Sequence, residues 1–132
     1  MRVCFDTNVL VSAVATRGIC ADLMNLVLAE HEVVLGETVL SELKRVLERK
    51  VRVPKATTAE LDAFLRQRAT VISASRQAPE GALDAADAAV LAEAAAGADV
   101  LVTGDRQLLE LPRPPIPIVS PRGLWDLLRT TS

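Results

Sequence analysis

The sequence predicts an α/β protein, a three-layer sandwich in which helices cover both faces of a central, mostly parallel β-sheet. Short apolar runs without alternation favour strands that are buried on both faces, as in a parallel sheet. Helical patterns lie between these runs, and that alternation is typical of the class. Half of the 132 residues are hydrophobic, so we expect one domain with its own core over residues 1–132.

Three segments are predicted as strands, at residues 3–5, 33–35 and 100–102. Each is short and continuously apolar, and each is followed by a polar residue or a glycine. Residues 71–72 and 116–119 are weaker candidates, which would bring the sheet to five strands.

Helical patterns occupy residues 21–30, 38–50, 59–69, 85–96 and 121–128. The fourth lies in an alanine-rich stretch, 82–98, and alanine is the best helix former. The last begins with Ser120 as N-cap and Pro121 at the first helical position. The proline-rich segment 112–117 predicts a loop, because proline lacks a backbone N–H.

The composition excludes several classes of protein. No apolar run approaches the roughly 18 residues of a membrane span, and Asp6 interrupts the first apolar run too early for a signal peptide. We therefore expect a cytoplasmic protein with no membrane partner. Cys4 and Cys20 are too few for a zinc site and are expected to be buried, reduced thiols. The single histidine, His31, excludes catalysis by a histidine pair.

The basic residues are concentrated in one segment, although the net charge is only -2. Residues 44–55 contain six of the 15 lysines and arginines, namely Lys44, Arg45, Arg49, Lys50, Arg52 and Lys55. Such a run is most often a solvated face, but it also suits phosphate groups. Three aromatic residues in the whole chain do not suggest a platform for stacking bases.

Acidic residues follow two of the predicted strands. Asp6 comes directly after the first, and Asp105 follows the strand at 100–102. Ligands of open α/β sheets bind beyond the carboxyl ends of the strands. Glu42 lies on the flank of one helix and Asp87 at the start of another, so these four acids are expected to cluster at one edge of the sheet.

A cluster of carboxylates persists only if a cation or protons neutralise it. Oxygen ligands alone suit hard cations such as Mg²⁺ or Mn²⁺. An ion held in this way most often serves phosphate chemistry, where it binds a phosphoryl oxygen and activates a water.

Each acid also has a simpler interpretation. Three of the four clustered acids, Asp6, Asp87 and Asp105, could stabilise helix starts as caps or first-turn acids. The same interpretation applies to Asp84, which lies three residues before Asp87. Glu42 could form a surface pair with Arg45, which would contribute only about 0.3–0.5 kcal/mol. We keep the capping interpretation for Asp84, whereas the joint pattern of the other acids predicts a site.

Four segments together resemble the motifs of PIN-domain nucleases. Residues 5–13 (FDTNVLVSA) are similar to the opening motif, and residues 38–43 (TVLSEL) to the second acidic motif. Residues 87–94 (DAAVLAEA) resemble the third motif, and residues 98–105 (ADVLVTGD) the fourth. Residues 118–124 look like the end of a stand-alone bacterial or archaeal subfamily described as toxin components.

The resemblance implies a PIN-like fold and assigns residues to a site. The catalytic and metal-holding acids would be Asp6, Glu42, Asp87 and Asp105, and the supporting polar residues would be Asn8 and Thr103. The third motif has fewer acids than is usual in the subfamily, which leaves open whether Asp84 joins the site. Arg45 and Arg49, on the flank of Glu42, are expected to bind the RNA backbone.

The activity implied is that of an Mg²⁺- or Mn²⁺-dependent endoribonuclease, the toxin of a toxin–antitoxin pair. A metal-activated water would attack phosphorus in line and leave a 5′-phosphate. The implied partners are an RNA substrate, a small antitoxin protein and, as in many members, a second copy in a homodimer.

Three other classes of protein compete with this interpretation. A signalling receiver domain needs a lysine near its last strand, but the last lysine is Lys55. A haloacid-type phosphatase needs a second acid two residues after the first, where this chain has Asn8. A catalytically inactive PIN-like module that binds RNA or protein stays as the alternative, and the presence of all four acids favours the enzyme.

Overall fold

The computed structural model describes residues 1–73 and 84–131. These residues form five strands and seven helices, which alternate along the chain. Their bounds are β1 Arg2–Phe5, α1 Thr7–Ala15, α2 Ile19–Glu30, β2 Glu32–Gly36, α3 Glu37–Arg49, α4 Lys55–Arg68, β3 Thr70–Ile72, α5 Ala85–Gly97, β4 Val100–Val102, α6 Arg106–Leu109, β5 Ile118–Val119 and α7 Pro121–Thr131.

The strands form one sheet in the order β3-β2-β1-β4-β5, and every pair in it is parallel. The chain leaves β1 toward β2 and β3, and then crosses back to place β4 on the other side of β1. The junction of β1 and β4 is therefore the point at which the strand order reverses. In open α/β sheets this point is where ligands bind.

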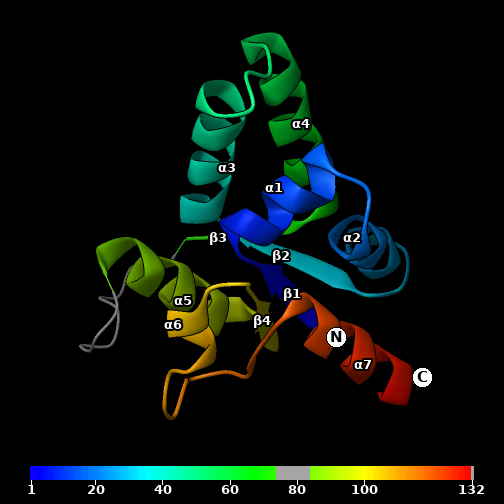
Figure 1. Cartoon of the computed structure of the whole chain (residues 1–132), viewed down its shortest axis with the longest axis vertical. Coiled ribbons are helices and arrows are strands. Elements are labelled where there is room, and N and C mark those ends of the chain that lie inside the picture. Colours follow the sequence, from blue (N-terminus) through cyan, green and yellow to red (C-terminus); the bar gives the residue numbers. More distant parts are fainter. Residues whose placement is uncertain (74–83, 132) are drawn as a thin grey trace.

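Helices cover both faces of the sheet, which confirms the predicted α/β sandwich. Helices α1, α3 and α4 lie on one side of the strands, and α5 and α6 lie on the other (Figure 1). Helix α7 packs against β5 and α2. Parallel strands need crossover connections, and a crossover helix buries its apolar face on the sheet.

The three strongest strand predictions form the centre of the core. Val3, Phe5 and Leu101 have no exposed surface, which explains why these runs are apolar throughout rather than alternating. The two weaker candidates are strands at the two edges of the sheet, but β5 begins at Ile118 and not at residue 116. Pro117, directly before it, has no N–H to donate to a sheet.

The helices differ from prediction mainly in the N-terminal half. Helix α1 is absent from the prediction, because its sequence is rich in β-branched residues and resembles a continuation of the first apolar run. Helix α4 begins at Lys55, four residues before the predicted start, with Pro54 as its N-cap. The predicted alanine-rich stretch starts at residue 82, so its first two residues lie outside the described part.

Both cysteines are free, as expected, but only one of them is buried. Burial raises the pKa of the Cys4 thiol to about 12, with a smaller contribution from the nearby Asp6 carboxylate. Cys20 is half-buried, which differs from the prediction, because it lies at the start of α2, near the surface of the fold.

Within the described ranges, no single helix is long and apolar enough to cross a membrane. Helices α1 and α2 would pass that test only as a pair, and the two are bent by 98° relative to each other.

Candidate active site

The site begins where β1 and β4 end side by side. Phe5 is paired with Val102, so the next residues, Asp6 and Thr103, are also neighbours. The Thr103 hydroxyl donates a hydrogen bond of 2.6 Å to Asp6 Oδ2. Asp6 Oδ1 accepts from the backbone N–H of Thr7 at 2.8 Å and caps α1. Both oxygens of this buried carboxylate are therefore fixed in position.

Thr103 also fixes the loop that carries Asp105. Its Oγ1 accepts a hydrogen bond of 3.0 Å from the backbone N–H of Asp105 while it donates to Asp6. Asp105 in turn caps the short helix α6, because its Oδ1 accepts from the N–H of Gln107. One fully buried hydroxyl thus orients two of the predicted acids, which agrees with the supporting place expected for Thr103.

Helix α5 brings Asp87 to the same edge of the sheet. Asp84 is its N-cap and accepts from the backbone N–H of Asp87 at 2.8 Å, so the simpler interpretation of Asp84 is correct. The Asp87 side chain forms a hydrogen bond with Asp105 and lies within electrostatic range of Asp6 and Asp84. Leu83, which precedes the cap, is outside the described residues.

Burial and the neighbouring acids both change the pKa of Asp87. Burial raises the pKa of Asp87 to about 6, and repulsion from Asp105, Asp84 and Asp6 adds to that effect. A hydrogen bond between two carboxyl groups requires a proton on one of them. In the absence of a cation, Asp87 therefore keeps its proton well above the ordinary pH range of an aspartic acid.

Glu42 joins the cluster through Thr7, a residue that sequence reasoning missed. The Thr7 hydroxyl donates to Glu42 Oε2 at 3.2 Å, and its backbone N–H donates to Asp6. Thr7 is buried at the first position of α1, so it can bridge acids from β1 and α3. The sequence signal that could have identified Thr7 is its position directly after Asp6. The predicted surface pair of Glu42 with Arg45 is absent from the described residues.

A second buried carboxylate, Glu93, was also missed. It is 6% exposed, and its Oε1 accepts from the backbone N–H of Thr38 at 3.0 Å. Gly36 ends β2 directly beneath it, and a Cβ at Gly36 would overlap Glu93 Oε1. The available signal was the isolated charge of Glu93 between the apolar residues of α5.

An open cleft of about 620 Å³ lies between α3 and α5, beside the acidic cluster. The described residues that line it are Glu37, Thr38, Ser41, Glu42, Arg45, Ser73, Ala86 and Glu93. Of the two predicted RNA-binding arginines, only Arg45 lines this cleft. Arg49, one turn further along α3, is exposed, and so is Asn8 at the start of α1.

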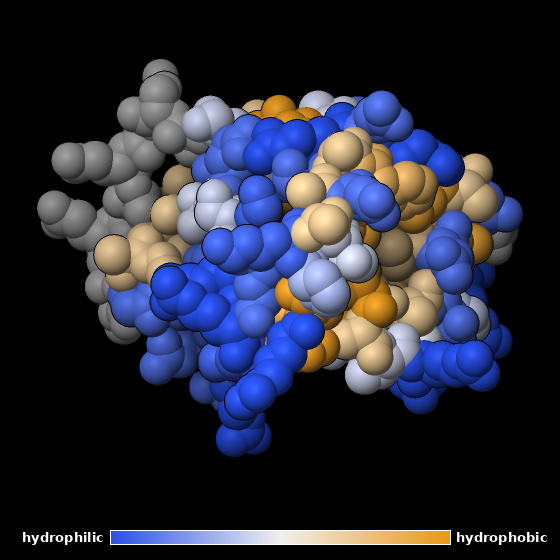
Figure 2. All heavy atoms as spheres, turned by 90° about the horizontal axis from the view of Figure 1, so that it is seen from above, coloured by the Kyte–Doolittle hydropathy of each residue, from blue (hydrophilic) through white to orange (hydrophobic). Residues whose placement is uncertain are grey.

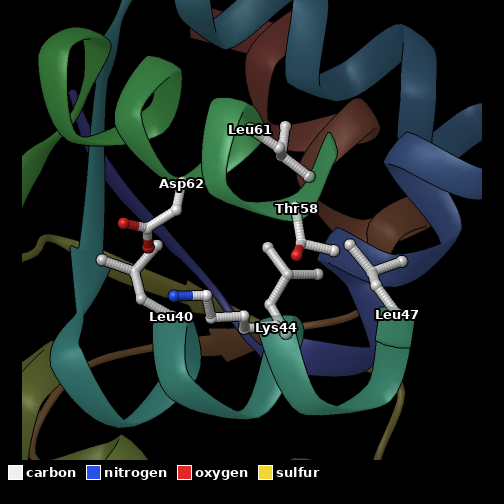
Figure 3. A pocket seen from close by; sticks show the side chains of 7 residues that line it. Leu40, Lys44, Leu47, Thr58, Leu61 and Asp62 are labelled. Carbon is white, nitrogen blue, oxygen red and sulfur yellow. The ribbon is translucent and has the colours of Figure 1, made fainter. Parts of the chain in front are cut away.

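A much smaller hollow lies between α3 and α4, where Leu40, Leu47, Thr58 and Leu61 point toward one another (Figure 3). Its volume of about 10 Å³ is close to the minimum that holds one water molecule. We therefore regard it as a packing defect between two helices and not as a ligand site.

The donor set at the β1–β4 edge suits a hard cation. All of the acids contribute oxygen, and burial together with repulsion from the neighbouring acids raises the pKa of Asp87. Within residues 1–73 and 84–131, no three side chains of the metal-binding types are arranged as a ready-made metal site. The side chains fit a hard cation in their chemistry and charge.

The structure is a parallel α/β sandwich with acidic side chains gathered at the switch point of its sheet. The chain belongs to the PIN domain family, whose family model matches residues 2–107. This family comprises nucleases that generally use divalent metal ions. The family resemblance drawn from four sequence motifs is confirmed.

The fold is similar to that of a chain in the crystal structure of VapBC2 from Rickettsia felis, in which VapBC2 is bound to a DNA fragment from its promoter. The TM-score is 0.68 at 17% sequence identity, and the match covers 91% of this chain and 98% of the other. Among curated proteins nothing matches the sequence.

Proposed function

We propose that this protein is an endoribonuclease that depends on Mg²⁺ or Mn²⁺ and is the toxin of a toxin–antitoxin pair. The observation that carries the proposal is the position of Asp6, Asp87 and Asp105 at the β1–β4 switch point of a PIN fold. Membership of a nuclease family supports the reaction class. The similarity to a chain of VapBC2 supports the toxin role.

The metal would be held by Asp6, Asp87 and Asp105, with Glu42 in direct contact or through water. A divalent cation at such a site lowers the pKa of a bound water and neutralises charge on a phosphoryl oxygen. Asp87 would bind the metal without its proton, because carboxylates bind metals in the ionised form.

The protein residues then have separate tasks. Thr103 holds Asp6 and Asp105 in place, and Thr7 holds Glu42 against Asp6. Arg45 lines the cleft, where its guanidinium can bind an RNA phosphate by two hydrogen bonds. Arg49, in the last turn of α3, and the exposed basic residues that follow this helix would extend the positive surface.

Asp6→Asn tests the reaction. Asparagine keeps the N-cap of α1 but removes the negative charge, so we expect a folded protein without metal-dependent RNA cleavage. Asp126→Asn, at an exposed position of α7, is the matched control and should cleave at the wild-type rate. Cleavage of an RNA panel by a folded Asp6→Asn protein at the wild-type rate would contradict the proposed site.

Calorimetric titration with Mn²⁺ distinguishes this enzyme from an inactive binding module. We expect saturable binding by the wild type and weak binding by Asp6→Asn, whereas an inactive module should bind Mn²⁺ poorly in both forms.

Induced expression tests the toxin role. The wild type should arrest growth, and Asp6→Asn should not. Co-expression of the neighbouring small gene product should restore growth if that product is the antitoxin.

A further inference from the structure

We propose that Glu93 is a positioning residue that fixes the start of α3 and thereby holds Glu42 in the acidic cluster; this inference rests on the proposed nuclease function. Glu93 lies on α5, the helix that also carries Asp87. Its carboxylate reaches across the cleft edge to Thr38 in the first turn of α3. It therefore joins the two helices that each supply one predicted catalytic acid.

The contact between Glu93 and α3 is direct. Both carboxylate oxygens accept from the Thr38 N–H, Oε1 at 3.0 Å and Oε2 at 3.4 Å. No side chain caps α3 from the N-cap position, because that residue is Gly36 and a glycine has none to offer. Glu93 thus supplies from another helix the acceptor that an N-cap residue usually supplies from its own.

The Glu93 carboxylate is buried, so its charge depends on the contact with α3. A buried carboxylate needs a compensating charge or strong hydrogen bonds. In the described part of the chain, no lysine or arginine forms an ion pair with Glu93. Its compensation comes from the first turn of α3, where free N–H groups and the helix dipole favour a negative charge.

The backbone beneath Glu93 is shaped to admit it. A Cβ at Gly36 would overlap Oε1 and lie 2.9 Å from both the Cβ and the Cδ of Glu93. Any side chain at this position would displace the carboxylate from Thr38. The close approach of β2 and α5 is therefore built into the fold at Gly36.

The link from Glu93 to the cluster is one turn of helix. Thr38 and Glu42 are four residues apart and lie on one face of α3. Glu42 is in turn bound by Thr7, the neighbour of Asp6. Release of Thr38 would let the first turn of α3 shift, and the 3.2 Å hydrogen bond between Thr7 and Glu42 would then be the first to break.

Three variants at one position test the proposal. Glu93→Gln keeps an oxygen at the same reach, Glu93→Asp keeps the charge but withdraws it from Thr38, and Glu93→Ala removes both. We expect kcat for RNA cleavage to fall by about ten-fold or more in the Asp and Ala variants, with KM little changed. Glu93→Gln should restore most of the activity, because the Thr38 N–H keeps its acceptor.

Hydrogen exchange of the metal-free protein provides a second readout that does not depend on catalysis. We expect faster amide exchange at Thr38 and the following residues of α3 in the Asp and Ala variants, and near wild-type exchange in Glu93→Gln. Leu124→Ala is the control for general destabilisation, because Leu124 is fully buried in α7. It should lower Tm without changing kcat or exchange in α3.

The outcomes distinguish failure of the proposed nuclease function from failure of the positioning role of Glu93. If the wild type cleaves no RNA, the proposed function fails, and exchange at Thr38 still decides whether Glu93 fixes α3. Wild-type exchange in α3 for Glu93→Ala would overturn the positioning role. Activity that follows the charge, kept in Glu93→Asp and lost in Glu93→Gln, would also overturn it, because the carboxylate would then act on metal or substrate itself.

Discussion

At the scale of single residues, the capping interpretation is correct for three of the acids, and the functional interpretation stays a prediction. Asp6, Asp84 and Asp105 each cap a helix, as their positions in the sequence suggested. All three also lie within electrostatic range of Asp87. Capping explains how these side chains are held in one orientation, whereas the repulsion between them contributes to the raised pKa of Asp87.

Asp87→Asn should stabilise the metal-free protein. In the wild type, the pKa of the Asp87 carboxyl is raised from 3.8 to about 6, so at neutral pH the folded state carries an unfavourable negative charge. The folded protein keeps a proton between about pH 4 and 6 that the unfolded chain has released, so the free energy of unfolding falls as pH rises through that window. We expect the variant to gain about 1 kcal/mol at about pH 7.5, with allowance for solvent screening of a partly exposed group.

Thermal unfolding of both proteins across pH measures this effect. The gain should be near zero at about pH 4 and complete above about pH 7. An equal difference in Tm at all pH values would show that the charge of Asp87 is not its cause.

Thr7→Val should reduce activity more than stability. Valine has the shape of threonine but lacks the hydroxyl that donates to Glu42. We expect kcat to fall by about ten-fold and the free energy of unfolding to fall by about 1 kcal/mol. Thr7→Ser, which keeps the donor, is the control for kinetics and chemical denaturation. Full activity of Thr7→Val would show that Glu42 needs no support from α1.

At the scale of elements, Gly36 determines how closely β2, α3 and α5 approach. Gly36→Ala should lower the free energy of unfolding by about 1–3 kcal/mol, because the new methyl group would overlap Glu93. Gly104→Ala is the control, since a Cβ there meets nothing within 4 Å, and its effect should stay within about 0.5 kcal/mol. Equal effects of the two substitutions would contradict the close approach.

The sequence predicted most elements because their patterns are local. Apolar runs identified all five strands, and periodicity identified five of the helices. Helix α1 was missed because its β-branched residues favour strand, and only Asp6 and the packing of α1 against α2 and α3 override that preference. The hydrogen bonds of Thr7 and Glu93 could not be predicted, since each joins residues that are far apart in the sequence and meet only in the folded chain.

At the scale of the whole molecule, hydrophilic and apolar side chains are distributed unevenly over the surface. In the view of Figure 2, apolar side chains gather in one area of the face, and hydrophilic side chains surround it. All six lysines and arginines of the predicted basic run are exposed. A nearly neutral protein can thus present a local surface for phosphate groups.

Replacing Arg45 and Arg49 together by alanine should weaken RNA binding and flatten its salt dependence. On a single strand, the slope of log K against log salt should fall by about 0.7 for each phosphate that is no longer neutralised. Arg17→Ala with Arg113→Ala is the control, because both arginines are exposed and lie outside the basic run. An unchanged slope in the first pair would assign these arginines to the ordinary solvated surface.

The hydrogen bond between Thr103 and Asp6 joins residues 97 positions apart, and this has a consequence for biosynthesis. A ribosome must release β4 as well as β1 before the two strands can pair and bring Thr103 and Asp105 to Asp6. Nascent chains and fragments that end earlier lack part of the acidic centre. A cell that makes a nuclease of this design is therefore exposed to its activity only after the chain has been synthesised beyond residue 105.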